Sequence, residues 1–144
     1  MLSEAICAAF PTIQSRFDMT GDYNKLSLIQ HLQNIVGAKY LLTDTLKKQA
    51  YTKGYRFGSG EAVAVAKPES LVQIWLLLKA CVEADVVVIM QAANTGLTGG
   101  STPNGKGYDR DIVIISTMRI DSIHLIDNAK QIIGLAGSTL FGLE

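Results

Sequence analysis

The stretch that decides the fold is VVVIMQAANTGLTGGSTPNGKGYDRDIVIIST, residues 86–117. It opens with Val86–Ala92, an apolar run that is rich in β-branched residues and does not alternate with polar ones. Such a run predicts a strand buried on both faces of a parallel sheet. A long glycine-rich loop follows, and Ile112–Thr117 predicts the next strand. The stretch therefore predicts two strands of an α/β sheet joined by a long loop.

The residues before this stretch complete a strand–helix–strand unit. Ala62–Ala66 predicts a short strand, which Pro68 ends because proline lacks an N–H donor and keeps its neighbour extended. Ser70 and Gln73 have the spacing of a capping box for a helix over Leu71–Glu83. We expect this helix to bury a wide apolar face that includes the tryptophan, with Cys81 also in the core; its apolar positions are Leu71, Ile74, Trp75, Leu78 and Val82.

Residues 1–57 are predicted to be mainly helical. Residues 1–11 suggest the start of a helix, because Glu4 stands where a signal peptide would be basic. Asn24 or Ser27 can cap a second helix, which Gly37 ends. The apolar residues of this second helix recur at helical spacing and should face the core: Leu26, Ile29, Leu32, Ile35 and Val36.

Two further connections can be predicted on either side of the sheet. Thr43 or Asp44 can cap a shorter helix that reaches about Tyr51, after which three glycines mark a flexible crossing at Gly54, Gly58 and Gly60. Near the end of the sequence, Ser122–Ile126 and Gln131–Ala136 are predicted strands that pair through a turn at Asp127 and Asn128, and Ser138 or Thr139 can cap another helix. The fold class expected is therefore α+β or α/β.

Composition excludes several classes of function. The 13 basic and 13 acidic residues cancel, so no basic surface for a nucleic acid is expected. Cys7, Cys81, His31 and His124 are too widely spaced for a disulfide framework or a metal site, and both cysteines are expected to be free thiols in a reducing compartment. No apolar stretch reaches the ~18–20 residues of a membrane-spanning helix. We expect a cytoplasmic location.

The loop Ala92–Ser101 carries the chemistry. It follows the carboxyl end of a predicted buried strand, which is where open α/β sheets bind ligands. Its glycines let the backbone approach a ligand, and successive N–H groups in such a loop can hold an anion. No Lys or Arg lies between Gln91 and Asn104, so neutral dipoles would hold the phosphates of a dinucleotide. The alternative is an ordinary glycine-rich connection. The short polar side chains of the loop are further donors: Asn94, Thr95, Thr98 and Ser101.

Two common phosphate-binding motifs do not fit this loop. Residues 100–107 match the first seven positions of a Walker A loop, but Gly107 stands where Ser or Thr should hold magnesium. The glycines at 96, 99 and 100 also lack the spacing of a G-x-G-x-x-G motif, and no helix follows them. Asp109, Arg110 and Asp111, which precede the next strand, are expected to pair locally, although Arg110 could instead steady the loop.

Met90–Thr117 resembles the corresponding stretch of the quinone-linked D-lactate dehydrogenases. The resemblance extends to LLKACVEAD at 77–85, to Met118–Asp121 and to Ala136–Leu140. It implies N-terminal helices (residues 1–57) followed by the first βαβ subdomain of an FAD-binding domain of the PCMH or vanillyl-alcohol-oxidase type (residues 58–144), incomplete at its C-terminus. It implies FAD as cofactor and assigns the FAD contacts to Ala92, Ala93, Asn94, Thr95, Gly96, Gly100 and Ser101.

The resemblance also implies an activity. In that family FAD takes a hydride from D-lactate, giving pyruvate, and electrons pass to quinone at the cytoplasmic face of the inner membrane, where the enzyme is peripheral. The substrate and quinone regions are expected to be missing from these 144 residues, and no catalytic residue can be assigned. Alternatives are another FAD-linked 2-hydroxy-acid oxidase, such as one acting on glycolate, or an inactive fragment or nucleotide-binding module. Gly137 is a further candidate near the cofactor, and the adenine side could involve Tyr55, Arg56 and Phe57.

Overall fold

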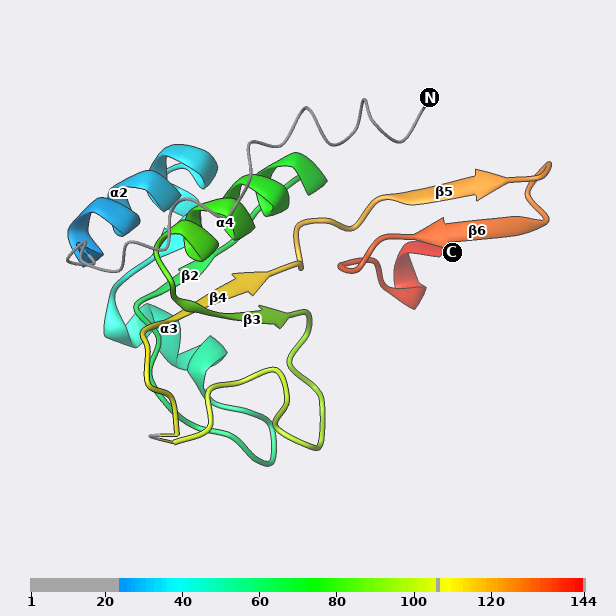
Figure 1. Ribbon diagram of the computed structural model, residues 1–144. Coiled ribbons are helices and arrows are strands. Elements are labelled where there is room, and N and C mark those ends of the chain that lie inside the picture. Colours follow the sequence, from blue (N-terminus) through cyan, green and yellow to red (C-terminus); the bar gives the residue numbers. More distant parts are fainter. Residues whose placement is uncertain (1–23, 106, 144) are drawn as a thin grey trace, which may run out of the picture.

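The structure is a computed structural model that describes residues 24–105 and 107–143 (Figure 1). The predicted helix start at residues 1–11 and Cys7 lie outside the described residues. The elements, in chain order, are α2 (Lys25–Val36), the 3-10 helix η2 (Ala38–Tyr40), β1 (Leu41–Leu42), α3 (Thr45–Thr52), β2 (Ala64–Ala66), α4 (Leu71–Glu83), β3 (Val87–Gln91), β4 (Ile112–Ser116), β5 (Ile123–Ile126), β6 (Gln131–Gly134) and the 3-10 helix η3 (Leu140–Leu143).

Four strands form the main sheet in the order β1-β2-β4-β3. β2, β4 and β3 are parallel, and β1 runs antiparallel to β2. β4 is central and buried along its whole length, whereas β3 lies at the edge, where Met90 is 43% exposed. The prediction that Val86–Ala92 is buried on both faces is therefore wrong, because an apolar run does not reveal how many strands will flank it. The two-residue strand β1 was missed because it is too short to show a period.

Helices cover both faces of this sheet. α2 and α4 pack on one face, and α3 lies on the other (Figure 1). Side chains of β4 alternate between these layers: Val113 and Ile115 join the core under α2 and α4, whereas Ile112 and Ile114 join a second core with Tyr51 of α3. The predicted βαβ unit, β2–α4–β3 with β4 beside both strands, is confirmed.

The helix caps follow the sequence closely. Asn24 accepts hydrogen bonds from two amides of the first turn of α2, and Gly37 ends that helix with φ 83°. Asp44 caps α3 by accepting from the Lys47 amide. Ser70 caps α4, where the Gln73 side chain accepts from the amide of Glu69 rather than from that of Ser70. α4 has the predicted bounds.

The outer side of α4 contradicts the sequence prediction. Trp75 is 60% exposed, so its assignment to the core is wrong. Cys81 is fully buried, as expected. Periodicity shows how wide the apolar arc of a helix is, but the width that becomes buried depends on its partners, and α2 with the sheet covers only one side of α4. The apolar residues predicted to be buried that are instead exposed are Leu71 and Val82 on α4 and Leu26 on α2.

The last two strands form a separate hairpin that projects away from the sheet (Figure 1). The two strands are joined by four residues, 127–130, and the predicted turn residues Asp127 and Asn128 lie among them with φ of 52° and 53°. β6 ends at Gly134, two residues earlier than expected, and the helix predicted after Ser138 or Thr139 is the short 3-10 helix η3. Gly137 is packed so closely that a Cβ there would collide with the Thr117 carbonyl oxygen, so packing alone accounts for this glycine.

Candidate functional site

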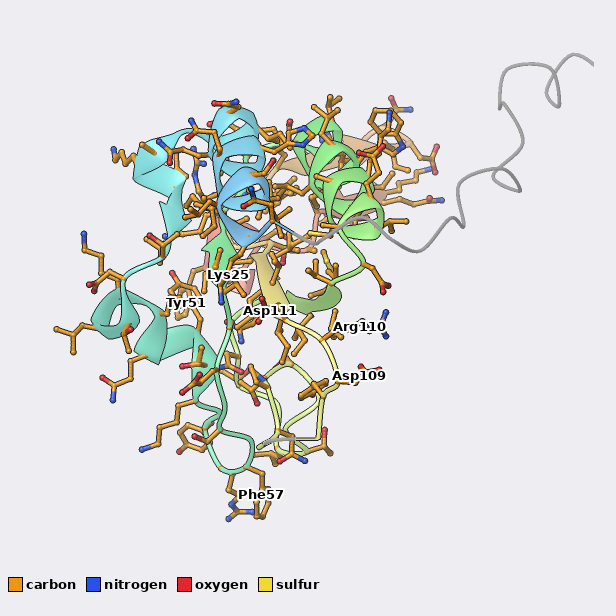
Figure 2. The ribbon with its side chains drawn as sticks, turned by 60° about the vertical axis from the view of Figure 1, so that its left-hand side comes forward. Lys25, Tyr51, Phe57, Asp109, Arg110 and Asp111 are labelled. Atoms are coloured by element: carbon orange, nitrogen blue, oxygen red, sulfur yellow. The ribbon has the colours of Figure 1, made fainter. Side chains whose placement is uncertain are left out.

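The loop Ala92–Ser101 leaves the carboxyl end of β3 and lies against a second glycine-rich segment, Gly54–Gly60. Gly58 accepts a hydrogen bond from the Gly54 amide at 2.8 Å, which closes the second segment into a tight turn. The segment is joined to the returning part of the chain, because the Gly105 amide donates to the Ser59 carbonyl at 2.8 Å. Figure 2 shows Phe57 at the far tip of these loops and Tyr51 close to the sheet.

The main-chain amides of Ala92–Ser101 are available to a ligand. None of these ten N–H groups donates a hydrogen bond to another residue in the described part of the chain. Asn94 and Gly99 have φ of 56° and 74°. A left-handed residue among right-handed ones turns successive N–H groups to one side and creates a concave anion site. The backbone of the loop therefore has the donors that the sequence predicted.

Two glycines of this loop also leave open space. A Cβ built on Gly96 would meet no atom within 4 Å, and one on Gly100 would meet only the Thr98 hydroxyl at 3.8 Å. By contrast, Gly58 has φ 89°, and a Cβ there would collide with the side chain of Thr102. The described packing does not require glycine at 96 or 100, whereas close approach of a bound group would require it. The open space at Gly96 and Gly100 leaves room for a bound group.

A groove of about 580 Å³ opens beside the first half of the loop. It brings Lys53 next to the loop, although the loop itself contains no cation. Tyr55, which is 79% exposed, lines the same groove, whereas Phe57 does not. The predicted adenine contacts of this segment stay a prediction. The lining consists of Leu46, Gln49, Ala50, Lys53, Gly54, Tyr55, Ala93, Asn94 and Thr95.

Two predicted ligand side chains are engaged within the protein. The Asn94 amide donates to the Lys53 carbonyl at 2.9 Å, and its oxygen accepts from the Ser101 hydroxyl at 3.0 Å. Gln91, which is 2% exposed, donates to the carbonyls of Tyr51 and Ser101. Asn94 and Ser101 therefore offer their backbone amides, while their side chains brace the loop. Gln91 was missed, although a polar residue that ends an apolar strand was the signal.

The predicted local pairing around Arg110 is correct in part. Arg110 donates to Asp85 at 2.7 Å and to Asp109 at 3.2 Å. These two hydrogen bonds raise the pKa of Arg110, and the bond to Asp85 contributes most. Asp111 pairs instead with Lys25 of α2 at 3.5 Å (Figure 2). These contacts attach the segment that returns to β4 to α2 and to the α4–β3 turn, and the hydrogen bonds of the Arg110 side chain go to Asp85 and Asp109 rather than to Ala92–Ser101.

A larger hollow of about 810 Å³ lies at the amino ends of β2 and β4. Its Lys48 ammonium donates to the carbonyls of Ala62 and Val63 at 2.6 and 3.2 Å, and burial, followed by the charge of Lys25, lowers the pKa of Lys48. These contacts tie α3 to the chain that leads into β2.

At the carboxyl end of β4, the buried hydroxyl of Ser116 has no hydrogen-bond partner among the residues described.

The described residues contain no candidate metal centre. Across residues 24–105 and 107–143, no three His, Cys, Asp or Glu side chains are grouped so that they could hold a metal ion. His31 and His124 are both exposed. Among the same residues, no helix combines the length and the apolar character needed to cross a membrane.

The sequence is similar to one segment of known dehydrogenases. Over 117 residues it is 62% identical to the quinone-dependent D-lactate dehydrogenase of Haemophilus influenzae, a match that covers 81% of this chain and 21% of that protein. It is 52% identical over 126 residues to the enzyme of the same name from Escherichia coli, covering 88% and 22%. The chain thus spans about a fifth of the length of these curated relatives. No family model matches it.

Solved structures share the fold at low identity. An alkyldihydroxyacetonephosphate synthase matches 71% of this chain and 21% of its own with a TM-score of 0.63 and 17% identity. p-Cresol methylhydroxylase matches 79% and 22% with a TM-score of 0.63 and 16% identity. A berberine bridge enzyme variant matches 81% and 24% with a TM-score of 0.61 and 12% identity. These matches confirm the predicted PCMH-type α/β fold.

Proposed function

We propose that this chain, as a relative of the quinone-dependent D-lactate dehydrogenases, supplies the loop that holds the FAD diphosphate in such an enzyme. The sequence relationship supports the family. The observation that carries the site is the loop itself, in which ten main-chain amides lack partners among the described residues and Gly96 has open space where a Cβ would stand. When bound, FAD would accept the hydride that leaves D-lactate as pyruvate forms, and it would pass electrons to quinone.

Main-chain amides are suited to this role. Each donor to a charged oxygen contributes roughly 1.5–3 kcal/mol net, so four or five donors suffice for a diphosphate. Lys53, at the adjoining groove, adds a positive charge that the loop lacks. The residues proposed to contact FAD are Ala92, Ala93, Asn94, Thr95, Gly96, Gly100 and Ser101, mainly through their N–H groups.

The test is flavin content. A polypeptide that contains these residues and extends to the length of the relatives should purify yellow, and Gly96→Asp should remove the flavin by adding bulk and negative charge against the diphosphate. The 144-residue chain alone should bind FAD weakly or not at all, since the other regions that would enclose the flavin are not in it. Unchanged flavin stoichiometry in Gly96→Asp, or tight stoichiometric binding by the 144 residues, would refute the assignment.

Substrate and location extend this proposal. The names of the relatives favour D-lactate and quinone, whose sites would lie in the part of the relatives that this chain does not span. Comparing D-lactate with glycolate and L-lactate in the extended polypeptide separates the favoured substrate from another FAD-linked 2-hydroxy acid. Absence of flavin absorbance would instead indicate a non-catalytic nucleotide-binding module. Recovery in the membrane fraction, and release by salt, would test peripheral attachment at the cytoplasmic face.

A further inference from the structure

Three side chains close the mouth of the glycine-rich loop. Gln91, the last residue of β3, donates through its side-chain amide to the carbonyl of Ser101 at 2.7 Å, at the other end of the loop. Ser101 in turn donates its hydroxyl to the Asn94 side chain at 3.0 Å. Residues ten positions apart are thereby joined directly. The chain of contacts runs from the strand, across the loop mouth, to the residue whose left-handed backbone turns the loop.

The same side chains attach the loop to the end of α3. The last carbonyls of a helix have no partner within the helix and need donors from elsewhere. Here Gln91 donates to the Tyr51 carbonyl at 2.9 Å, and the Asn94 amide donates to the Lys53 carbonyl at 2.9 Å. The loop mouth and the helix end therefore satisfy each other's polar groups, and Gln91 is almost fully buried where they meet.

We propose that Gln91, Asn94 and Ser101 form a clamp that presets the loop for the anion, with Gln91 as the main positioning residue. The clamp itself follows from these contacts, and its effect on flavin rests on the proposed function. A glycine-rich loop that is free to move holds the binding conformation only part of the time, and its apparent Kd rises by the inverse of that fraction. The clamp raises that fraction without its side chains touching the ligand.

The size of the effect follows from the number of bonds. Gln91→Leu keeps a buried side chain of similar size and removes both donors of Gln91. At the usual net value of a hydrogen bond, the loss of two corresponds to roughly 10- to 30-fold in the population of the clamped loop. Asn94→Gly, which tolerates the left-handed backbone, also removes two bonds, and Ser101→Ala removes only one. We expect the order Gln91→Leu, then Asn94→Gly, then Ser101→Ala.

The first experiment uses the 144-residue chain without flavin. Backbone ¹⁵N order parameters of residues 92–101 should be near the ~0.85 of rigid backbone in the unchanged chain and should fall below about 0.6 in Gln91→Leu, while β4 stays rigid. Gln30→Glu, on the exposed side of α2, is the control and should change nothing. Loop order parameters that do not change in Gln91→Leu and Ser101→Ala would overturn the clamp. Ser101→Ala keeps the test decisive if Gln91→Leu fails to fold.

The second experiment gives a signature that general destabilisation would not produce. Gln91→Glu places an acceptor against two carbonyls, but its protonated form regains one donor. In the extended polypeptide, FAD affinity of Gln91→Glu should therefore recover several-fold as the pH falls from 8 to 5, beyond any change in Gln30→Glu. Equal pH dependence in both variants would overturn the role of Gln91. If Gln91→Leu loses loop order but the extended polypeptide without substitutions binds no flavin, the clamp is upheld and the proposed function is refuted.

Discussion

The two glycine-rich segments of this protein, Gly54–Gly60 and Ala92–Ser101, are similar in composition, but packing within the chain requires glycine at a key position of the first and not at a key position of the second. In Gly54–Gly60, Gly58 is fixed by its own chain, because its φ is positive and a Cβ would collide with Thr102. In Ala92–Ser101, Gly96 has an ordinary φ and empty space around the position of a Cβ. A glycine can therefore be required by the folded chain or by a group that the chain holds, and only the surroundings distinguish the two cases.

Both kinds of glycine occur within Ala92–Ser101 itself. Gly99 has φ 74°, and a Cβ there would lie 3.2 Å from the backbone of Phe57, so this glycine belongs with the packing type. Its neighbour Gly100 is open. The two loops thus meet at Gly99, and the open positions Gly96 and Gly100 lie on either side of that contact. Substitutions can separate stability from flavin binding.

The largest effect should come from Gly58→Ala. A left-handed backbone and a steric collision together should lower the free energy of unfolding by about 2–4 kcal/mol, as measured by urea denaturation. Gly105→Ala is the matched control, because Gly105 has φ 63° but an added methyl group there would meet no atom within 4 Å, so only the backbone cost of about 1–2 kcal/mol applies. An equal decrease in the free energy of unfolding in the two variants would show that the collision with Thr102 does not make glycine necessary at position 58.

Gly96→Ala should show the opposite pattern. The free energy of unfolding should change by less than about 0.5 kcal/mol, because the added methyl group meets nothing in the folded chain. In the extended polypeptide, the Kd for FAD should rise about tenfold or more, since the methyl group would stand where the diphosphate approaches, an effect of ~1.4 kcal/mol. Flavin titration checks this. If Gly96→Ala is stable and its affinity for FAD is unchanged, Gly96 does not face the diphosphate.

The smallest expected effect is on the rate at which the Cys81 thiol is alkylated, which can be compared between Gly58→Ala and Gly96→Ala. Burial raises the pKa of the Cys81 thiol to about 11, so alkylation at pH 8 should be slow in a Cys7→Ser background and faster in urea. Gly58→Ala should speed the labelling of Cys81 by populating the unfolded chain, and Gly96→Ala should not.

The pH dependence has a definite sign. Because the folded thiol has the higher pKa, its contribution to stability is present below the unfolded value of about 8.5 and is lost as the pH rises through about 11. Urea denaturation of the Cys7→Ser chain should therefore show a loss of stability across this window that is absent when Cys81 is also replaced by Ala. The same loss in both chains would attribute it to other groups.

Local signals predicted most of the elements. The cap of α3 at Asp44 and the bounds of α4 follow from hydrogen bonds between residues three or four positions apart, which a sequence displays directly. The edge position of β3 and the exposure of Trp75 could not be predicted in this way, because they depend on which elements lie beside them. The apolar face of α4 is as wide as expected, but the described chain covers only part of it.

The same division applies to the candidate site. The sequence by itself determined the place of the loop, after a strand and rich in glycine, and, through resemblance, the enzymes to which the chain is similar. Only the tertiary structure decided that Asn94 and Ser101 brace the loop, that Gln91 and the end of α3 hold it, and that Lys53 stands beside it. The reason is distance along the chain: a backbone preference acts within a few residues, whereas Gln91 meets Tyr51 across 40 positions.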